Sequence, residues 1–164
     1  MKTDFFDGYE KMNDGYLNFF NNRTHFFIGM TEDRETEKYS ILDRRLKDRK
    51  GRWCNVELKI RTCDINTHEH LFIEQKKWEV FKRDYEEKGI LPIYINFMKN
   101  GHNVFIISLK DYFDGKRSIE KTTVEIKNKG YERTDHNEVR YLIPVREGHF
   151  YQYDEITDRF NRRW

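Results

Sequence analysis

The fold of this chain is decided by the stretch YSILDRRLKDRKGRWCNVELKIR, residues 39–61. Two runs within it, 39–47 and 53–61, are typical of β-strands, and Asp48-Arg49-Lys50-Gly51 joins them. In the second run aliphatic residues occupy every second position: Val56, Leu58 and Ile60. A period of two places these aliphatic side chains on one face of a strand and the intervening polar ones on the other. The stretch therefore predicts a β-hairpin with one apolar face.

The length of the hairpin loop decides which residues face each other. If the loop is Arg49-Lys50-Gly51, the glycine takes the left-handed position of a type I turn followed by a bulge. Asp43 then lies opposite Glu57 on the same face. A four-residue loop would instead place Asp43 opposite Val56, on the wrong face. Because facing residues have Cβ atoms about 5 Å apart, the shorter loop brings the two carboxylates within reach of one metal ion.

A carboxylate and an ammonium group stand side by side on the second strand. Glu57 and Lys59 are two residues apart and project from the same face, while Leu58 points into the core. Metal-assisted attack on a phosphodiester uses such a pair. The carboxylate binds a divalent cation, and the lysine positions or activates water or stabilises developing negative charge. The alternative interpretation is an ordinary solvated strand face with alternating charges.

The flanking segments predict an α+β fold. Apolar residues at three- and four-residue steps favour a helix over 5–20, although Gly8 and Gly15 interrupt it, and a second helix over 71–88 with Gly89 as its C-cap. Further strands are predicted at 90–98, 104–109, 122–126 and 138–145, with Asn100-Gly101 as a hairpin turn. This order favours an α/β (α+β) fold in which helices flank a mixed central β-sheet. We expect a single domain over residues 1–164.

Composition excludes several classes of protein. The chain has 164 residues, of which 37% are charged, but 13 Phe, 10 Tyr and 3 Trp indicate a folded core. The net charge of +2 excludes a uniformly basic coat. There is no apolar run of about 18 residues and no secretory signal, so we expect a cytoplasmic protein that does not bind membranes. Cys54 and Cys63 do not form a C-x-x-C pair, which favours reduced thiols.

Asp43, the Glu57-Leu58-Lys59 triplet and the helix that follows resemble the PD-(D/E)XK nuclease superfamily. The resemblance covers roughly residues 35–110 and departs at Leu42, which stands where the motif has proline. It implies a restriction-endonuclease-like core and hydrolysis of phosphodiesters with Mg²⁺ or Mn²⁺. The implied metal ligands are Asp43, Glu57 and the backbone carbonyl of Leu58, and Lys59 positions the attacking water.

Many members of this superfamily add a carboxylate from the helix that precedes the motif. Glu10 suits that role if residues 5–20 form the first helix, whereas Glu35 or Glu37 suits it if a helix lies just before Asp43. We favour Glu37. At the start of the second predicted helix Glu74, Gln75 and Lys77 are candidates to extend the site; the alternative for Glu74 and Lys77 is a solvated helix face.

Local charge predicts a nucleic-acid partner. Six cations and a single carboxylate, Asp48, lie between positions 44 and 52. The cations are Arg44, Arg45, Lys47, Arg49, Lys50 and Arg52, and Arg61 follows on the second strand. Such a hairpin attracts a phosphate backbone, with binding that weakens as salt rises. The alternative is a charged hairpin that protects the sheet against edge-to-edge aggregation.

These observations predict a small metal-dependent nuclease that acts on DNA rather than RNA. Within the superfamily, a structure-specific endonuclease resembling Holliday-junction resolvases fits the small size best, and because such enzymes usually act as dimers we expect a homodimer. Two alternatives remain open: a nucleic-acid-binding module without cleavage, and an interaction or inhibitor protein whose charged hairpin engages an acidic partner. His68-Glu69-His70 has no third ligand at a useful spacing, so we expect no zinc site.

Overall fold

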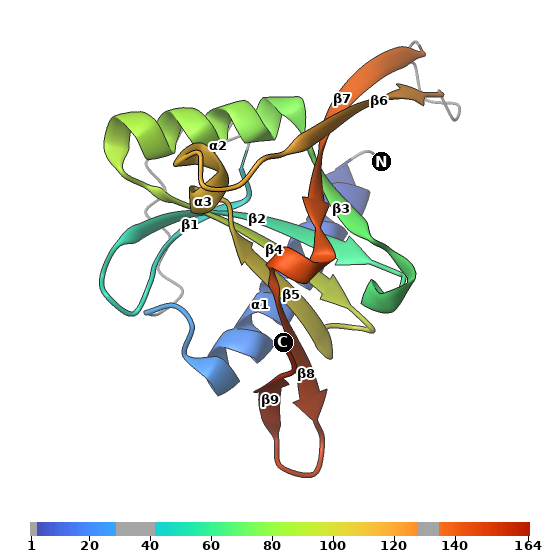
Figure 1. Cartoon of the computed structure of the whole chain (residues 1–164). Helices are drawn as coiled ribbons and strands as arrows, with labels where there is room; N and C mark the ends of the chain where they lie inside the picture. Colours follow the sequence, from blue (N-terminus) through green and yellow to red (C-terminus); the bar gives the residue numbers. More distant parts are fainter. Residues whose placement is uncertain (1–2, 29–41, 128–134) are drawn as a thin grey trace.

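The computed structural model has an α+β architecture built on two β-sheets (Figure 1). It describes residues 3–28, 42–127 and 135–164, and only the backbone of residues 3–7, 9 and 10. The helices are α1 (Thr3–Thr24), α2 (Gln75–Lys88) and α3 (Lys110–Phe113), with short 3₁₀ helices η1 (Ile65–Thr67) and η2 (Val145–Glu147). The strands are β1 (Arg44–Lys47), β2 (Trp53–Arg61), β3 (His70–Glu74), β4 (Leu91–Met98), β5 (Asn103–Ser108), β6 (Glu120–Ile126), β7 (His136–Pro144), β8 (His149–Asp154) and β9 (Arg159–Arg162).

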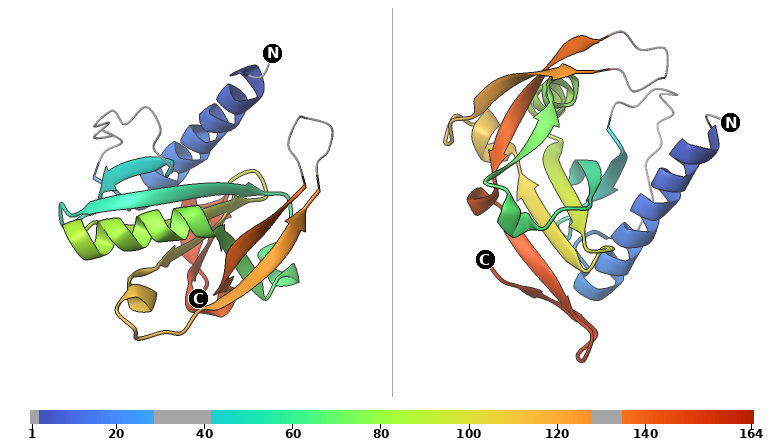
Figure 2. Two further views of the ribbon diagram at one scale, coloured as in Figure 1. Left: turned by 90° about the horizontal axis from the view of Figure 1, so that it is seen from above. Right: turned by 90° about the vertical axis from the view of Figure 1, so that its right-hand side faces the viewer.

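The large sheet is mixed and has helices on both of its faces. Its strand order is β1-β2-β4-β5-β8-β9, and a smaller sheet has the order β3-β7-β6. Helix α1 lies across one face of the large sheet, whereas α2, α3 and the smaller sheet lie on the other (Figure 2). Two apolar cores result. Leu17 and Phe20 of α1 pack with Val56 and Leu58 on one side, and the core on the other side contains Phe81 of α2.

The predicted hairpin register is confirmed. Arg44 pairs with Val56 and Lys47 with Trp53, so Asp43, which directly precedes β1, lies opposite Glu57. The loop closes through the Asp48 amide, which donates to the Arg52 carbonyl at 2.9 Å. Gly51 has a φ of +75°, the left-handed conformation that this turn needs at its last position. The two carboxylates are therefore brought to one face by local turn chemistry.

Strand β2 is internal, and both of its faces are covered. It pairs antiparallel with β1 and parallel with β4, so that Glu57 is beside Tyr94 and Lys59 is beside Asn96. The parallel pairing requires a crossover, and α2 belongs to it. As predicted, Leu58 points into an apolar core. The opposite face is not solvated, because α2 and the smaller sheet cover it.

The prediction of a helix over 71–88 is wrong at its beginning. Residues His70–Glu74 form β3, and α2 begins at Gln75. Leu71 and Ile73 alternate on one buried face and pair with β7, which is a period of two rather than of 3.6. The predicted C-cap is confirmed: Gly89 has a φ of +69°, and its amide donates to the carbonyl of Tyr85 at 3.0 Å.

Most other elements agree with the sequence. The predicted helix over 5–20 is confirmed as α1, and the strands predicted at 90–98, 104–109, 122–126 and 138–145 are β4 to β7. Of the first strand, predicted over 39–47, residues 44–47 form β1, residues 42 and 43 form a bend before it, and residues 39–41 lie outside the described residues. The hairpin of β8 and β9 was not predicted. No helix in the described residues is long and apolar enough to cross a membrane.

Candidate functional site

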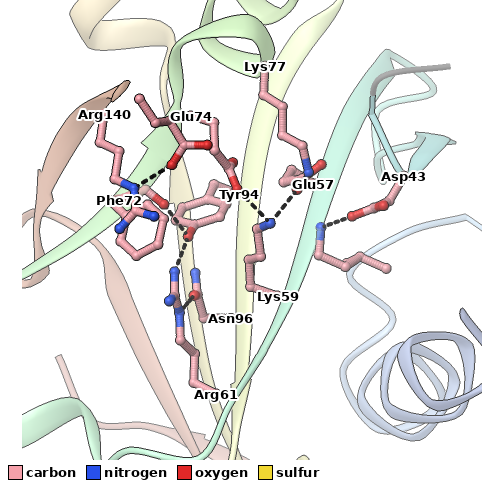
Figure 3. A network of polar contacts seen from close by, with 12 residues as sticks. Asp43, Glu57, Lys59, Arg61, Phe72, Glu74, Lys77, Tyr94, Asn96 and Arg140 are labelled. Carbon is pink, nitrogen blue, oxygen red and sulfur yellow. Dashed lines mark hydrogen bonds and ion pairs between the residues drawn. The ribbon is translucent and has the colours of Figure 1, made fainter. Parts of the chain in front are cut away.

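The buried carboxylate of Glu57 is the centre of a charged cluster (Figure 3). Its side chain is fully buried, and two ammonium groups approach the same oxygen, Oε1. Lys59 Nζ lies 3.3 Å from it, and Lys77 Nζ, from the first turn of α2, donates a short hydrogen bond to it. The second oxygen, Oε2, accepts no hydrogen bond from any described residue. Glu57 therefore has one oxygen that contacts two ammonium groups and one that accepts no hydrogen bond from the described residues.

Glu74 continues the cluster at the junction of β3 and α2. Lys59 Nζ donates to Glu74 Oε1 at 3.2 Å, so this lysine bridges two carboxylates. The other oxygen of Glu74 is also buried and has no partner in the described part of the chain. Glu74 precedes α2 directly, and Lys77 is three residues further on, so that both side chains reach β2, at Lys59 and Glu57 respectively. The solvated helix face considered for Glu74 and Lys77 is therefore wrong.

Asp43 is held beside this cluster by a hydrogen bond to β2. Its Oδ2 accepts the amide of Leu58 at 2.7 Å (Figure 3). The geometry follows from the hairpin register, in which Asp43 is opposite Glu57 and next to Leu58. The structure thus brings Asp43, in the bend before β1, beside Glu57 and Lys59 of β2, as the sequence predicts.

The electrostatics of the cluster differ from one carboxylate to the next. Burial raises the pKa of Glu57 to about 7, with a further increase from the negative charge of Asp43, and the two lysines offset only part of this. Burial also acts to raise the pKa of Glu74, but the charges of Lys59 and Lys77 and the hydrogen bonds to the carboxylate together outweigh it, and the pKa is lowered. Burial acts to lower the pKa of Lys59, but Glu57 and Glu74 outweigh it and raise the pKa. Near neutral pH, Glu57 therefore titrates while Glu74 and Lys59 stay charged.

The donor set suits a hard divalent cation, with two carboxylates as its ligands. Mg²⁺ and Mn²⁺ prefer carboxylate oxygens, and the unpartnered Oε2 of Glu57 is a buried acceptor on a carboxylate that interacts electrostatically with Asp43. Among the described residues there is no group of three or more His, Cys, Asp or Glu side chains that could hold a metal. Asp43 and Glu57 would hold the ion together with a backbone carbonyl or water.

The other predicted ligands lie in different places. Glu37, which we favoured, and Glu35 lie outside the described residues, and Glu10 belongs to α1 with only its backbone described. Both cysteines are free thiols, and burial raises the pKa of Cys54 to about 11, which makes this thiol a poor nucleophile.

A polar network next to the cluster was not predicted. Arg61 Nε donates to Asn96 Oδ1 and Arg61 Nη2 to the Tyr94 hydroxyl, both at 3.0 Å, and this hydroxyl donates to the Phe72 carbonyl at 2.8 Å (Figure 3). The guanidinium of Arg140 lies 3.8 Å from the centre of the Phe72 ring. Arg61, predicted to contact phosphate, also lies 4.7 Å from the centre of the Phe72 ring and so contacts both sheets. Arg61, Asn96 and Tyr94 belong to the paired strands β2 and β4, and the pairing of β3 with β7 adds Phe72 and Arg140. This long-range pairing leaves no local signal in the sequence.

Most cations of the hairpin make contacts within the protein. Arg44 binds Asp14, Arg45 binds Asn55 and Asp84, Arg49 binds the carbonyls of Thr24 and His25, and Arg52 binds Asp48. Lys47 lies over the ring of Trp53, 4.5 Å from its centre. Lys50 is exposed, and its ammonium group has no partner in the described part of the chain. The set available to phosphate is thus smaller than the sequence predicts.

Comparisons of this chain with protein-family models, with curated proteins and with solved structures found no match.

Proposed function

We propose that this protein is a metal-dependent nuclease that hydrolyses phosphodiester bonds in DNA. The observation that supports this most is the buried Glu57, which has Asp43 opposite it, Lys59 on its own face and one oxygen without a donor. A fully buried carboxylate with an unpartnered oxygen costs free energy in a folded protein, and such costs concentrate at functional sites. A bound cation would remove that cost.

Each residue has a distinct role in this proposal. Asp43 and Glu57 hold a Mg²⁺ or Mn²⁺ ion, which polarises the phosphate and lowers the pKa of water when it is bound. Lys59 keeps its proton, because Glu57 and Glu74 raise its pKa, so it donates hydrogen bonds to water or to phosphate oxygen. Glu74 holds Lys59 from the other side. The hydrogen bond from the Leu58 amide fixes the orientation of Asp43.

A second candidate function is a nucleic-acid-binding module without cleavage. The contact of Lys77 with Glu57 favours it, since a lysine that neutralises the carboxylate gives the cluster a purely structural role. The two candidates differ in one measurable property, namely whether Asp43 and Glu57 bind a divalent cation.

We predict that Asp43→Asn abolishes metal-dependent cleavage and leaves the fold intact. Asparagine keeps an oxygen for the Leu58 amide but removes the charge that a cation needs. The assay is a cleavage panel of four-way junction, duplex and single-stranded DNA and single-stranded RNA, each with Mg²⁺, Mn²⁺ or EDTA. We expect activity to fall by more than about a hundredfold, as for lost metal-site residues. Asp64→Asn, at a partly exposed aspartate that contacts Lys99, is the matched control.

Calorimetric titration with Mn²⁺ separates the two candidate functions. Binding in the wild type that is lost in Asp43→Asn, together with cleavage in the panel, supports the nuclease. Metal binding without cleavage of any substrate contradicts the nuclease, and no binding at all favours the non-catalytic module. Cleavage by Asp43→Asn at the wild-type rate would show that the site lies elsewhere. Sedimentation velocity on the same samples tests for a homodimer.

A further inference from the structure

A pocket with an apolar floor lies on the opposite face of the large sheet from Glu57. Its volume is about 630 Å³, within the range of small-molecule sites. Cys54 and Ile93 line it, and both belong to the core beneath α1. Because Cys54 and Glu57 are three positions apart on β2, they point to opposite faces of the sheet. The pocket is therefore separate from the charged cluster.

The floor of the pocket consists of aromatic rings on a rigid support. Phe26, Tyr151 and Phe160 line it, and each is only partly buried. All three pack against the fully buried ring of Phe20, with centroid separations of 6.1, 5.5 and 5.0 Å respectively. Phe20 lies in the last turns of α1, between the helix and the sheet. The rings are thus held in place with accessible surface left over, as a stacking platform requires.

The rim of the pocket is cationic. Five basic residues from three parts of the chain line it: Arg23, Arg49, Lys50, Arg52 and Lys110. Arg23 is paired with Asp158 and Lys110 with Asp114, two carboxylates outside the lining. Arg49 keeps its charge, because among the described residues it donates only to backbone carbonyls. The pocket contains one carboxylate, Asp48, and its oxygens already accept hydrogen bonds from the amides of Lys50 and Arg52 and from the Arg52 side chain. The exposed ammonium group of Lys50 has no partner in the described residues. The net positive charge beside the apolar floor therefore comes from Lys50 and Arg49, and the paired cations Arg23, Arg52 and Lys110 complete the rim.

We propose that this pocket binds a nucleotide of single-stranded nucleic acid, with its base on the aromatic floor and its flanking phosphates on the basic rim. Aromatic side chains bordered by Lys and Arg are the groups that bind single strands without sequence preference. The cations belong to the end of α1, the β1–β2 hairpin and the start of α3. Cations on several sides of the pocket suit a single strand of nucleic acid, in which each base has a phosphate on both sides. They suit a free mononucleotide less well, because its phosphate is at one end.

This inference goes beyond the proposed nuclease and does not depend on it. Binding at the pocket involves none of Asp43, Glu57 and Lys59 and needs no metal. It is therefore measured in EDTA, where cleavage does not occur. A failure of the metal site would leave binding unchanged, and a failure of the pocket would leave metal binding unchanged.

The test is fluorescence anisotropy with a labelled oligothymidylate about ten nucleotides long, in EDTA and over a series of salt concentrations. We expect Tyr151→Leu, which keeps apolar volume but removes the ring, to weaken binding about tenfold. Tyr141→Leu, at a half-buried tyrosine that stacks on Trp78 beneath the other face, is the matched control and should bind like the wild type. Circular dichroism and thermal unfolding establish that both variants fold.

The charge of the rim is tested separately. We expect Lys50→Glu to weaken binding at low salt and to reduce the salt dependence, with a slope smaller in magnitude by about one. Lys76→Glu, at an exposed lysine on α2, should change neither. Equal affinity for an abasic strand of the same length, equal affinity for free thymidine monophosphate, or equal effects of the pocket and control variants would each overturn the proposal.

Discussion

Replacing Glu57 with Gln is expected to abolish Mg²⁺-dependent cleavage and, in the same protein without metal, to raise the free energy of unfolding at pH 8. The loss of activity follows from the loss of a ligand charge. The gain in stability follows from burial, which raises the pKa of Glu57 from 4.5 to about 7. A buried carboxylate that must ionise at pH 8 costs free energy, whereas the amide of the same shape does not.

The direction of the pH dependence follows from proton linkage. Between pH 4.5 and 7 the folded wild type keeps a proton on Glu57 that the unfolded chain has released. Stability therefore falls as pH rises through this range, by about 3 kcal/mol in total. Glu57→Gln lacks this dependence. The difference between variant and wild type should be small at pH 4.5 and should grow until the pH exceeds 7.

Urea unfolding in EDTA at several pH values between 4.5 and 8 measures this difference. Glu74→Gln is the matched control from the same cluster, because its effect has the opposite sign. The pKa of Glu74 is lowered, chiefly by Lys59 against the effect of burial, so its ionised form stabilises the fold above the unfolded pKa. Its variant should therefore lose stability at pH 8. Parallel pH profiles for Glu57→Gln and the wild type would contradict the burial argument.

The same contrast favours the proposed metal site over a purely structural ion pair. Pairing alone would lower the pKa of a carboxylate and contribute stability at neutral pH, as Glu74 does. Glu57 has two lysines beside it and still has a raised pKa, because it is fully buried and faces Asp43. Two close carboxylates on a buried strand destabilise the metal-free protein. The proposed divalent cation, bound between them, would reverse that effect.

The sequence predicts those parts of the site that depend on local chemistry. The turn Asp48-Arg49-Lys50-Gly51 sets the register through a glycine in the left-handed conformation, and the register in turn places Asp43 opposite Glu57. A period of two in residues 53–61 fixes which side chains share a face with Glu57. Neither inference needs a contact with a distant part of the chain.

The parts that the sequence does not predict depend on long-range pairing. Strand β3 pairs with β7, whose residues lie about seventy positions later, and five residues with two buried aliphatic positions are too few to distinguish a strand from a helix. This pairing covers the face of Glu57, brings Glu74 over Lys59 and draws Arg61 into the network around Tyr94. The β8–β9 hairpin was not predicted for a related reason. It lies at the edge of the sheet, and its many polar residues leave no clear alternation of apolar and polar positions.

Replacing Gly148 with Ala is expected to destabilise the fold strongly. Gly148 joins η2 to β8, and a Cβ atom there would lie 2.2 Å from Phe105 Cε2 and 2.3 Å from Phe105 Cζ. Phe105 is fully buried in the core on the α2 face, so its ring has no space into which to move. Overpacking of this kind costs about 1–3 kcal/mol or more. Thermal and urea unfolding would measure the loss.

Gly15→Ala is the matched control, and its expected effect has the opposite sign. Gly15 lies within α1, where a Cβ atom would meet nothing within 4 Å, so alanine should stabilise the helix by up to about 1 kcal/mol. Loss of stability only in Gly148→Ala would therefore result from the close packing at Gly148 and not from the added methyl group itself.

Phe105 pairs with Asn96, and Asn96 pairs with Lys59, so displacement of the Phe105 ring would reach the strand beside the charged cluster. If the Gly148→Ala protein were as stable as the wild type, Gly148 would not pack tightly against Phe105. The proposed link from this contact through β5 and β4 to the charged cluster would then be wrong.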